Sequence, residues 1–141
     1  MRLRSHTGGV TSFGRGGVVC KSNKHKLNTR GSTEAEIVGV SDFLPNAIWA
    51  KHFLESQGHQ VMAAWLEQDN ESAIKLEKNG RASAGPESCH IDIRYFWTKN
   101  RLAMEHIGVC HCPIKLMLAE FFTKALQGNL FRRFRDVILG I

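Results

Sequence analysis

A long amphipathic helix is the feature that most restricts the fold of this chain. Between Thr33 and about Gln57, apolar residues recur at the spacing of one helix face, namely Ile37, Val40, Leu44 and Ile48. Gly58 follows as a residue suited to end the helix in the left-handed conformation. Pro45 lies inside the stretch and removes one backbone donor, so we expect either a kink or two abutting helices.

Strand and helix patterns alternate around this helix. Two short strands joined by glycines, 10–13 and 18–24, predict a hairpin, and the apolar run 61–66 predicts a strand buried on both faces. The remaining pattern predicts helices at about 70–78, 91–102, 113–126 and 130–139, with a strand at 106–110. This order indicates an α/β fold in which helices cover a mixed sheet. We expect the three tryptophans, Trp49, Trp65 and Trp97, in the core, with base stacking as the alternative.

Length and composition indicate one folded domain that binds a polyanion. The 141 residues are 43% apolar, enough for an ordinary core. The net charge is +6, and residues 1–33 contain seven Lys or Arg residues and no acid, which suits a nucleic acid. A solvated face or a basic tail is the alternative. The sequence has no signal peptide, no apolar run that could span a membrane and no disulfide framework, so we expect an intracellular protein with reduced thiols.

Three acidic residues stand out by position. Glu34 lies in the first turn of the long helix, inside a predicted capping box of Thr33 and Glu36, and has no evident structural task beyond the helix dipole. Asp69 follows a strand, where α/β proteins place their chemistry, although it could instead cap the next helix. Glu120 lies mid-helix in an apolar setting and could instead pair with Lys124.

A divalent cation would relieve the repulsion among clustered carboxylates, and two such ions are the usual device for cutting a phosphodiester. A zinc site built from Cys89, His90, Cys110, His111 and Cys112 is a weaker hypothesis. Adjacent ligands strain a tetrahedral site, and the sequence has no CxxC motif.

Four motifs in order resemble a known family: Ser32-Thr-Glu-Ala-Glu36, Gln68-Asp-Asn-Glu-Ser-Ala-Ile74, His90-Ile-Asp-Ile-Arg-Tyr95 and Leu118-Ala-Glu-Phe-Phe-Thr-Lys124. Together they are similar to the ribonuclease H domain at the C-terminal end of the Pol polyprotein of copia-type LTR retrotransposons. The resemblance implies a ribonuclease H-like fold over residues 1–127, followed by a basic amphipathic tail at 128–141. It also implies two Mg²⁺ ions, with Mn²⁺ as a substitute, that hydrolyse the RNA strand of an RNA/DNA hybrid during reverse transcription.

By motif match, the resemblance makes Glu34, Asp69 and Glu120 the catalytic metal ligands. Glu120 stands where the family has Asp, and its longer arm could displace a metal by about 1 Å. The family's first catalytic Asp lies on a central strand just before the segment that Arg4–Gly9 matches. We therefore expect a truncated, inactive domain that lacks this strand. The implied partners are the hybrid and an upstream reverse transcriptase domain, and we expect no membrane and no small-molecule substrate. The implied location is the cytoplasm, a virus-like particle or the nucleus.

A set of basic residues and one histidine are candidates for nucleic-acid contact: Arg4, Lys21, Lys24, Lys26, Arg30, His90 and Arg94. The role of the motif His90-Ile-Asp-Ile-Arg94 stays open, and a solvent-facing helix start is its alternative. A second function is also consistent with the sequence, namely a non-catalytic nucleic-acid binder that uses the basic hairpin together with Arg132, Arg133 and Arg135.

Overall fold

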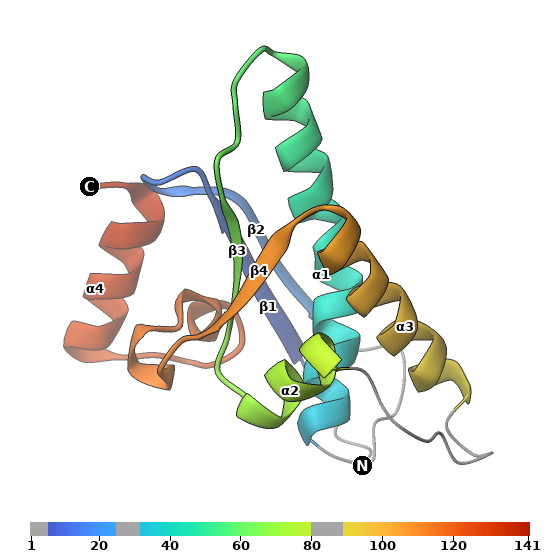
Figure 1. Cartoon of the computed structure of the whole chain (residues 1–141). Helices are drawn as coiled ribbons and strands as arrows, with labels where there is room; N and C mark the ends of the chain where they lie inside the picture. Colours follow the sequence, from blue (N-terminus) through green and yellow to red (C-terminus); the bar gives the residue numbers. More distant parts are fainter. Residues whose placement is uncertain (1–5, 25–31, 80–88) are drawn as a thin grey trace. The chain divides into compact units, whose positions relative to one another are not determined.

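The computed structural model describes residues 6–24, 32–79 and 89–141 (Figure 1). The elements in chain order are β1 His6–Ser12, β2 Gly17–Lys24, α1 Ser32–Ser56, β3 Ala64–Gln68, α2 Glu71–Asn79, α3 Cys89–Met104, β4 Ile107–His111, the 3-10 helices η1 Ile114–Leu116 and η2 Leu118–Phe122, and α4 Gly128–Leu139. This mixture of helices and small sheets confirms the predicted α/β class, and it is consistent with a ribonuclease H-like fold.

The elements form two compact units. The hairpin unit contains β1, β2, η1, η2 and α4, and the helical unit contains α1, β3, α2, α3 and β4. The division into residues 1–127 and 128–141 stays a prediction. None of the helices in the described parts of the chain combines the length and the apolar character that a membrane span needs.

In the hairpin unit, β1 and β2 pair antiparallel as predicted. The turn between them uses Gly14 and Gly16 with φ of 114° and 74°, a conformation that other residues rarely adopt. The α4 helix buries Phe134, which is only 1% exposed, and Phe131 stacks on Phe121 of η2 with ring centroids 5.2 Å apart. The predicted basic amphipathic helix near the C-terminus is therefore confirmed.

The predicted helix at 113–126 is wrong, because this segment forms η1 and η2 with extended backbone at Met117 between them. Contacts with β1 and β2 explain the difference. The hydroxyl of Ser22 donates to the carbonyl oxygen of Phe122 at 2.6 Å, and η2 lies directly against β1 at Gly8. The hydroxyl therefore takes the place of the backbone amide that would bond this carbonyl in a longer α-helix.

In the helical unit, α1 runs unbroken through Pro45, so the alternative of two abutting helices is wrong. The helix ends at Ser56, and Gly58 beyond it is the predicted left-handed stop, with a φ of 86°. The amide of Gly58 donates to the carbonyl of Glu55, and the amide of His59 donates to that of Leu54, both at 3.0 Å. These two bonds are the usual closure of a helix by a left-handed residue.

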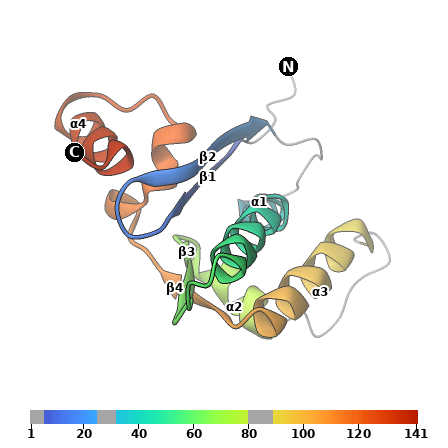
Figure 2. The same cartoon turned by 90° about the horizontal axis from the view of Figure 1, so that it is seen from above.

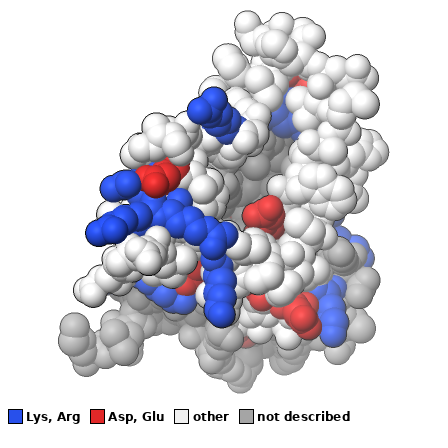
Figure 3. All heavy atoms as spheres, turned by 90° about the vertical axis from the view of Figure 1, so that its left-hand side faces the viewer, with Lys and Arg blue, Asp and Glu red and all other residues white. Residues whose placement is uncertain are grey.

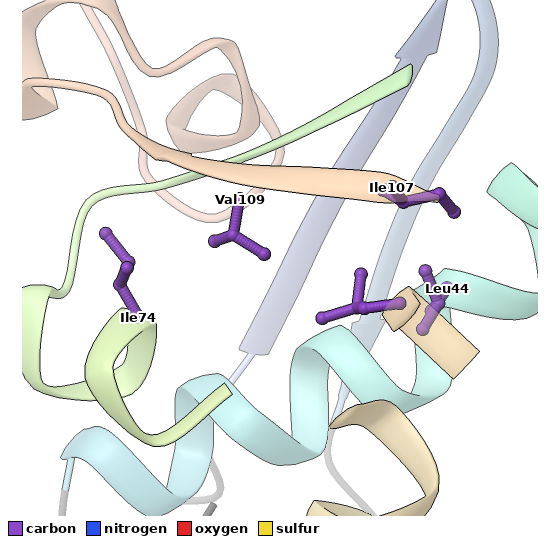
Figure 4. Close-up of a cluster of buried hydrophobic side chains, with 5 residues drawn as sticks. Leu44, Ile74, Ile107 and Val109 are labelled. Atoms are coloured by element: carbon purple, nitrogen blue, oxygen red, sulfur yellow. The ribbon is translucent and has the colours of Figure 1, made fainter. Parts of the chain in front are cut away.

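The core of the helical unit lies between its helices and one face of its sheet. The strands β3 and β4 pair parallel, with Ala64 opposite Ile107. Leu44 of α1, Ile74 of α2, and Ile107 and Val109 of β4 converge in one cluster that Leu102 of α3 completes (Figure 4). The helices α1 and α3 lie side by side (Figures 1 and 2). The predicted apolar face of α1 is confirmed, because Ile37 and Leu44 are fully buried.

The strand predicted to be buried on both faces is not. Side chains of β3 alternate between partly buried and exposed up to Gln68, and Trp65 is 66% exposed. Core packing covers only the face that carries Ala64 and Leu66. The expectation of tryptophans in the core is wrong for Trp49 and Trp65, which are both largely exposed, while Trp97 packs against the core.

Candidate acidic site

Asp69 lies directly after β3, at the carboxyl end of a parallel strand pair. The buried side chain of Gln68 fixes the backbone there, because its Oε1 accepts the amides of Asp69 at 2.9 Å and Asn70 at 3.3 Å. The carbonyl of Gln68 accepts the amide of Cys112 at 2.9 Å, which extends the pairing with β4. The end of the strand is therefore rigidly built around Gln68.

The cap of α2 is Asn70, so the alternative that Asp69 caps this helix is wrong. Oδ1 of Asn70 accepts the amide of Ala73 at 3.1 Å, and its carbonyl accepts the amide of Ile74 at 3.0 Å. Among the described residues, no hydrogen bond or ion pair engages the carboxylate of Asp69. A carboxylate at a strand end without a structural partner is available for a ligand.

Glu34 lies in the first turn of α1, as predicted. The predicted capping by Thr33 and Glu36 stays a prediction, because the residues before α1 lie outside the described part. One turn after Glu34, Ile37 joins a buried cluster with Ala73 and Tyr95. Since Ala73 lies one turn after Asp69, this cluster packs the beginning of α1 beside the beginning of α2. Glu34 and Asp69 thus belong to packed neighbouring segments of the helical unit.

Glu120 belongs to the hairpin unit, on η2. Its side chain is 15% exposed and forms an ion pair with Lys124, which is the alternative that the sequence left open. The carbonyl of Glu120 also accepts the amide of Lys124 at 3.0 Å. Gly8 and Ser22 hold the neighbouring residues of η2 against the hairpin, so the position of Glu120 within this unit is well defined.

The convergence of all three acids stays a prediction, because Glu34 and Asp69 belong to one unit and Glu120 to the other. Over the described ranges, no three or more His, Cys, Asp or Glu side chains form a group that could hold a metal ion. Sequence reasoning missed Gln68 and Asn70 as the residues that build the strand end. The alternation of inward residues along β3, from Ala64 through Leu66 to Gln68, was the signal for a buried glutamine.

The cysteines give the zinc hypothesis no support in the described chain. Burial raises the pKa of Cys112 to about 11, and the charge and hydrogen bond of Glu67 add to the effect. At neutral pH and without a metal this side chain is therefore a neutral thiol, and the described residues include no group of three or more potential ligands around it. Cys20, Cys110 and Cys112 are free, as predicted, while the side chains of Cys89 and His90 lie outside the described part.

The nucleic-acid candidates differ in their surroundings. Arg94 joins α3 to α1, because its Nη1 lies 2.7 Å from Oγ of Ser41 and 2.5 Å from Oδ1 of Asp42. This contact gives the arginine of the open motif a structural role between two helices. Lys24 is exposed on β2, and Lys21 is partly exposed. The other candidates lie outside the described residues or have side chains that do: Arg4, Lys26, Arg30 and His90.

Comparison with known proteins relates the chain to a retrotransposon protein. The chain is similar to the "Retrovirus-related Pol polyprotein from transposon TNT 1-94" of Nicotiana tabacum, with 28% identity over 135 residues. The match covers 96% of this chain and 10% of the polyprotein. No protein-family model matches, and no solved structure does. The chain is thus homologous to a segment of a retrotransposon Pol polyprotein and spans about a tenth of the length of that relative.

Proposed function

We propose that the chain is the ribonuclease H-like segment of a copia-type Pol polyprotein, with Glu34, Asp69 and Glu120 as its metal-binding acids. The observation that carries this proposal is Asp69 at the end of a parallel strand, whose carboxylate has no hydrogen bond or ion pair with any described residue. Glu34 lies in the first turn of α1, whose beginning packs beside the beginning of α2. The order of the four motifs and the homology to a Pol polyprotein support the same assignment.

The proposed substrate is the RNA strand of an RNA/DNA hybrid. Bound Mg²⁺ would supply an activated water and stabilise the leaving 3′ oxygen. Within the chain, the carboxylates of Asp69 and Glu34 would hold the cations, and Glu120 would join them after giving up its pairing with Lys124. The 2′-hydroxyl groups in the minor groove would distinguish RNA from DNA.

Hydrolysis needs more than these three acids under this proposal. The resemblance implies four carboxylates, and the match of the described motifs supplies three of them. We therefore expect the 141 residues alone to bind divalent ions weakly and to cut no hybrid. Addition of an upstream segment that carries a strand with the fourth acid is expected to restore cleavage.

Two assays on the purified chain test the proposal. Calorimetry with Mn²⁺ is expected to show binding that Asp69→Asn abolishes, while Glu71→Gln, which removes a neighbouring exposed acid, leaves it intact. A nuclease assay on a labelled RNA/DNA hybrid with Mg²⁺ is expected to show no product. Mn²⁺ binding that is unaffected by Asp69→Asn would reject the site. Cleavage that Asp69→Asn abolishes would keep the nuclease assignment and reject the expected inactivity.

The distribution of charge favours a second candidate function, a non-catalytic nucleic-acid binder. Residues 1–28 and 114–141, which include the hairpin unit, carry eleven Lys or Arg residues and two acids. Residues 29–113 carry eight Lys or Arg residues and eleven acids. A binder of this kind would not need divalent ions, and its affinity would be unchanged by Asp69→Asn.

A further inference from the structure

The positive charge of the hairpin unit is largely uncompensated by its own acids. Its two acidic residues both have a basic partner within the unit, since Glu120 pairs with Lys124 and Asp136 pairs with Arg135. The distance between Nη2 of Arg135 and Oδ1 of Asp136 is 2.6 Å. The remaining Lys and Arg residues of the unit therefore present a field of one sign, which attracts polyanions.

Two arginines on α4, Arg132 and Arg133, contribute most to this positive field. The helix packs through its aromatic face, where Phe134 is 1% exposed and Phe131 stacks on Phe121. Arg132 and Arg133 lie on the exposed part of the helix, and no hydrogen bond or ion pair within the described chain engages either of them. Figure 3, which faces α4, shows Lys and Arg side chains gathered there beside few acidic atoms.

The hairpin turn adds a third arginine at the end of the same helix. The Nε of Arg15 donates to the carbonyl oxygen of Gly140 at 3.1 Å, which holds Arg15 at the C-terminus of α4. Gly16, next in the turn, also lies against Gly140, because a Cβ there would be in van der Waals contact with the backbone nitrogen of Gly140 at 3.5 Å. A guanidinium group at a helix C-terminus is also favoured by the helix dipole.

We propose that the α4 arginine surface, defined as Arg15, Arg132 and Arg133, binds the phosphate backbone of a nucleic acid. Guanidinium groups match phosphate oxygens with paired hydrogen bonds, and within the described chain Arg132 and Arg133 have no partner that such a contact would have to displace. The inference rests on the nucleic-acid partner of the proposed function, but it is independent of the three acids and of hydrolysis.

A nucleic acid fits this surface better than an anionic membrane does. Helices that lie in a membrane interface insert their apolar face between the lipids. In α4 the centre of that face is occupied inside the protein, by the burial of Phe134 and the stacking of Phe131. The middle of the apolar face is therefore already packed, although Val137, Leu139 and Ile141 near the end of α4 are exposed, so an anionic membrane is tested as the alternative partner.

Binding measured without divalent ions separates this surface from the acidic site. A fluorescent RNA/DNA hybrid is titrated with the purified chain in EDTA at several salt concentrations. Each phosphate contact contributes about 0.9 to the slope of log affinity against log salt, so we expect Arg132→Ala/Arg133→Ala to reduce the slope by about 2. Lys75→Ala/Lys99→Ala removes the same charge from the helical unit and is expected to leave the slope unchanged.

The outcomes distinguish the possibilities. An equal reduction of the salt slope by both double variants would show a general charge effect and would overturn the proposal. An unchanged slope in the arginine variant would also overturn it. Vesicles that contain phosphatidylserine are the second probe, and tighter binding to them than to the hybrid would also overturn the proposal. Circular dichroism checks that the arginine variant is folded. A loss of Mn²⁺ binding in Asp69→Asn with an unchanged salt slope would show that the acidic site and the α4 arginine surface bind independently.

Discussion

The amide of Ala73 donates a hydrogen bond to Oδ1 of Asn70 at 3.1 Å, and this contact makes Asn70, and not Asp69, the cap of α2. Two polar residues precede α2, and either could cap it by sequence. The structure assigns the cap to Asn70. Asp69 therefore does not cap the helix, and its carboxylate is left for the task that a metal ligand at this position would have.

Asn70→Ala is expected to destabilise the protein by about 1 kcal/mol, the usual cost of losing a side-chain cap. Asp69→Asn is expected to change the free energy of unfolding by less than about 0.5 kcal/mol, because no hydrogen bond of the described chain uses its carboxylate. Urea denaturation of both variants measures the difference. If Asp69→Asn costs as much as Asn70→Ala, Asp69 has a structural task and the acidic site loses its central argument.

Gly8→Ala is expected to destabilise the protein by about 1–3 kcal/mol, the usual cost of overpacking. An added Cβ would collide with the carbonyl oxygen of Ala119 and lie 3.0 Å from Cβ of Phe122, so β1 and η2 would have to separate. The midpoint of urea unfolding measures the effect.

Gly108→Ala is the matched control for this substitution. Its added Cβ would lie 2.5 Å from Cζ3 of Trp65, but that indole is 66% exposed and can turn toward solvent. We expect a cost below about 1 kcal/mol, offset in part by the lower flexibility of alanine in the unfolded chain. A larger cost at Gly108 than at Gly8 would mean that Trp65 is fixed in place and that η2 is not.

Protonation of Glu105 is expected to lower the stability of the protein in acid. The hydrogen bond with His52, whose Nε2 lies 2.7 Å from Oε2 of Glu105, lowers the pKa of this carboxyl, and Lys51 lowers it further against the opposing effect of burial. A lowered pKa means stabilisation that is present above the ordinary glutamate pKa of about 4.3 and is lost as the pH falls through the folded pKa. Glu105→Gln should therefore flatten the loss of stability below about pH 5.

The control for this pH dependence is Glu55→Gln. Glu55 is 43% exposed, and its one ion pair with a described residue is the one with Lys51, at 3.7 Å, so its removal should leave the loss of stability in acid nearly unchanged. Unfolding by urea at a series of pH values compares the two variants with the parent chain. If the free energy of unfolding falls as steeply with decreasing pH in Glu105→Gln as in the parent chain, the acid sensitivity comes from another group.

Lys124→Ala is expected to strengthen Mn²⁺ binding about two- to fivefold if Glu120 is a metal ligand, because the metal ion would no longer compete with Lys124 for the carboxylate. Lys115→Ala removes the same charge from an exposed position on η1 and should have little effect. Calorimetry measures both affinities. Equal changes in the two variants would indicate a general charge effect and would remove Glu120 from the site.

The sequence alone determined the elements whose signals are local. The glycines of the turn predicted the hairpin, the spacing from Ile37 to Ile48 predicted α1, and Gly58 marked its end. These features depend on backbone conformations and side-chain periodicity within a few residues, so a reader of the sequence can find them. The three acids were chosen in the same way, by their positions relative to expected strands and helices.

Only the tertiary structure decided which of several locally acceptable arrangements forms. It made Asn70 the cap of α2, exposed one face of β3, and turned the expected helix around Glu120 into η1 and η2. The last change depends on Gly8 and Ser22, which lie about a hundred residues earlier in the chain and bind the backbone of η2. Contacts between distant segments override propensities worth less than about 1 kcal/mol per residue, and their partners are not apparent in the local sequence.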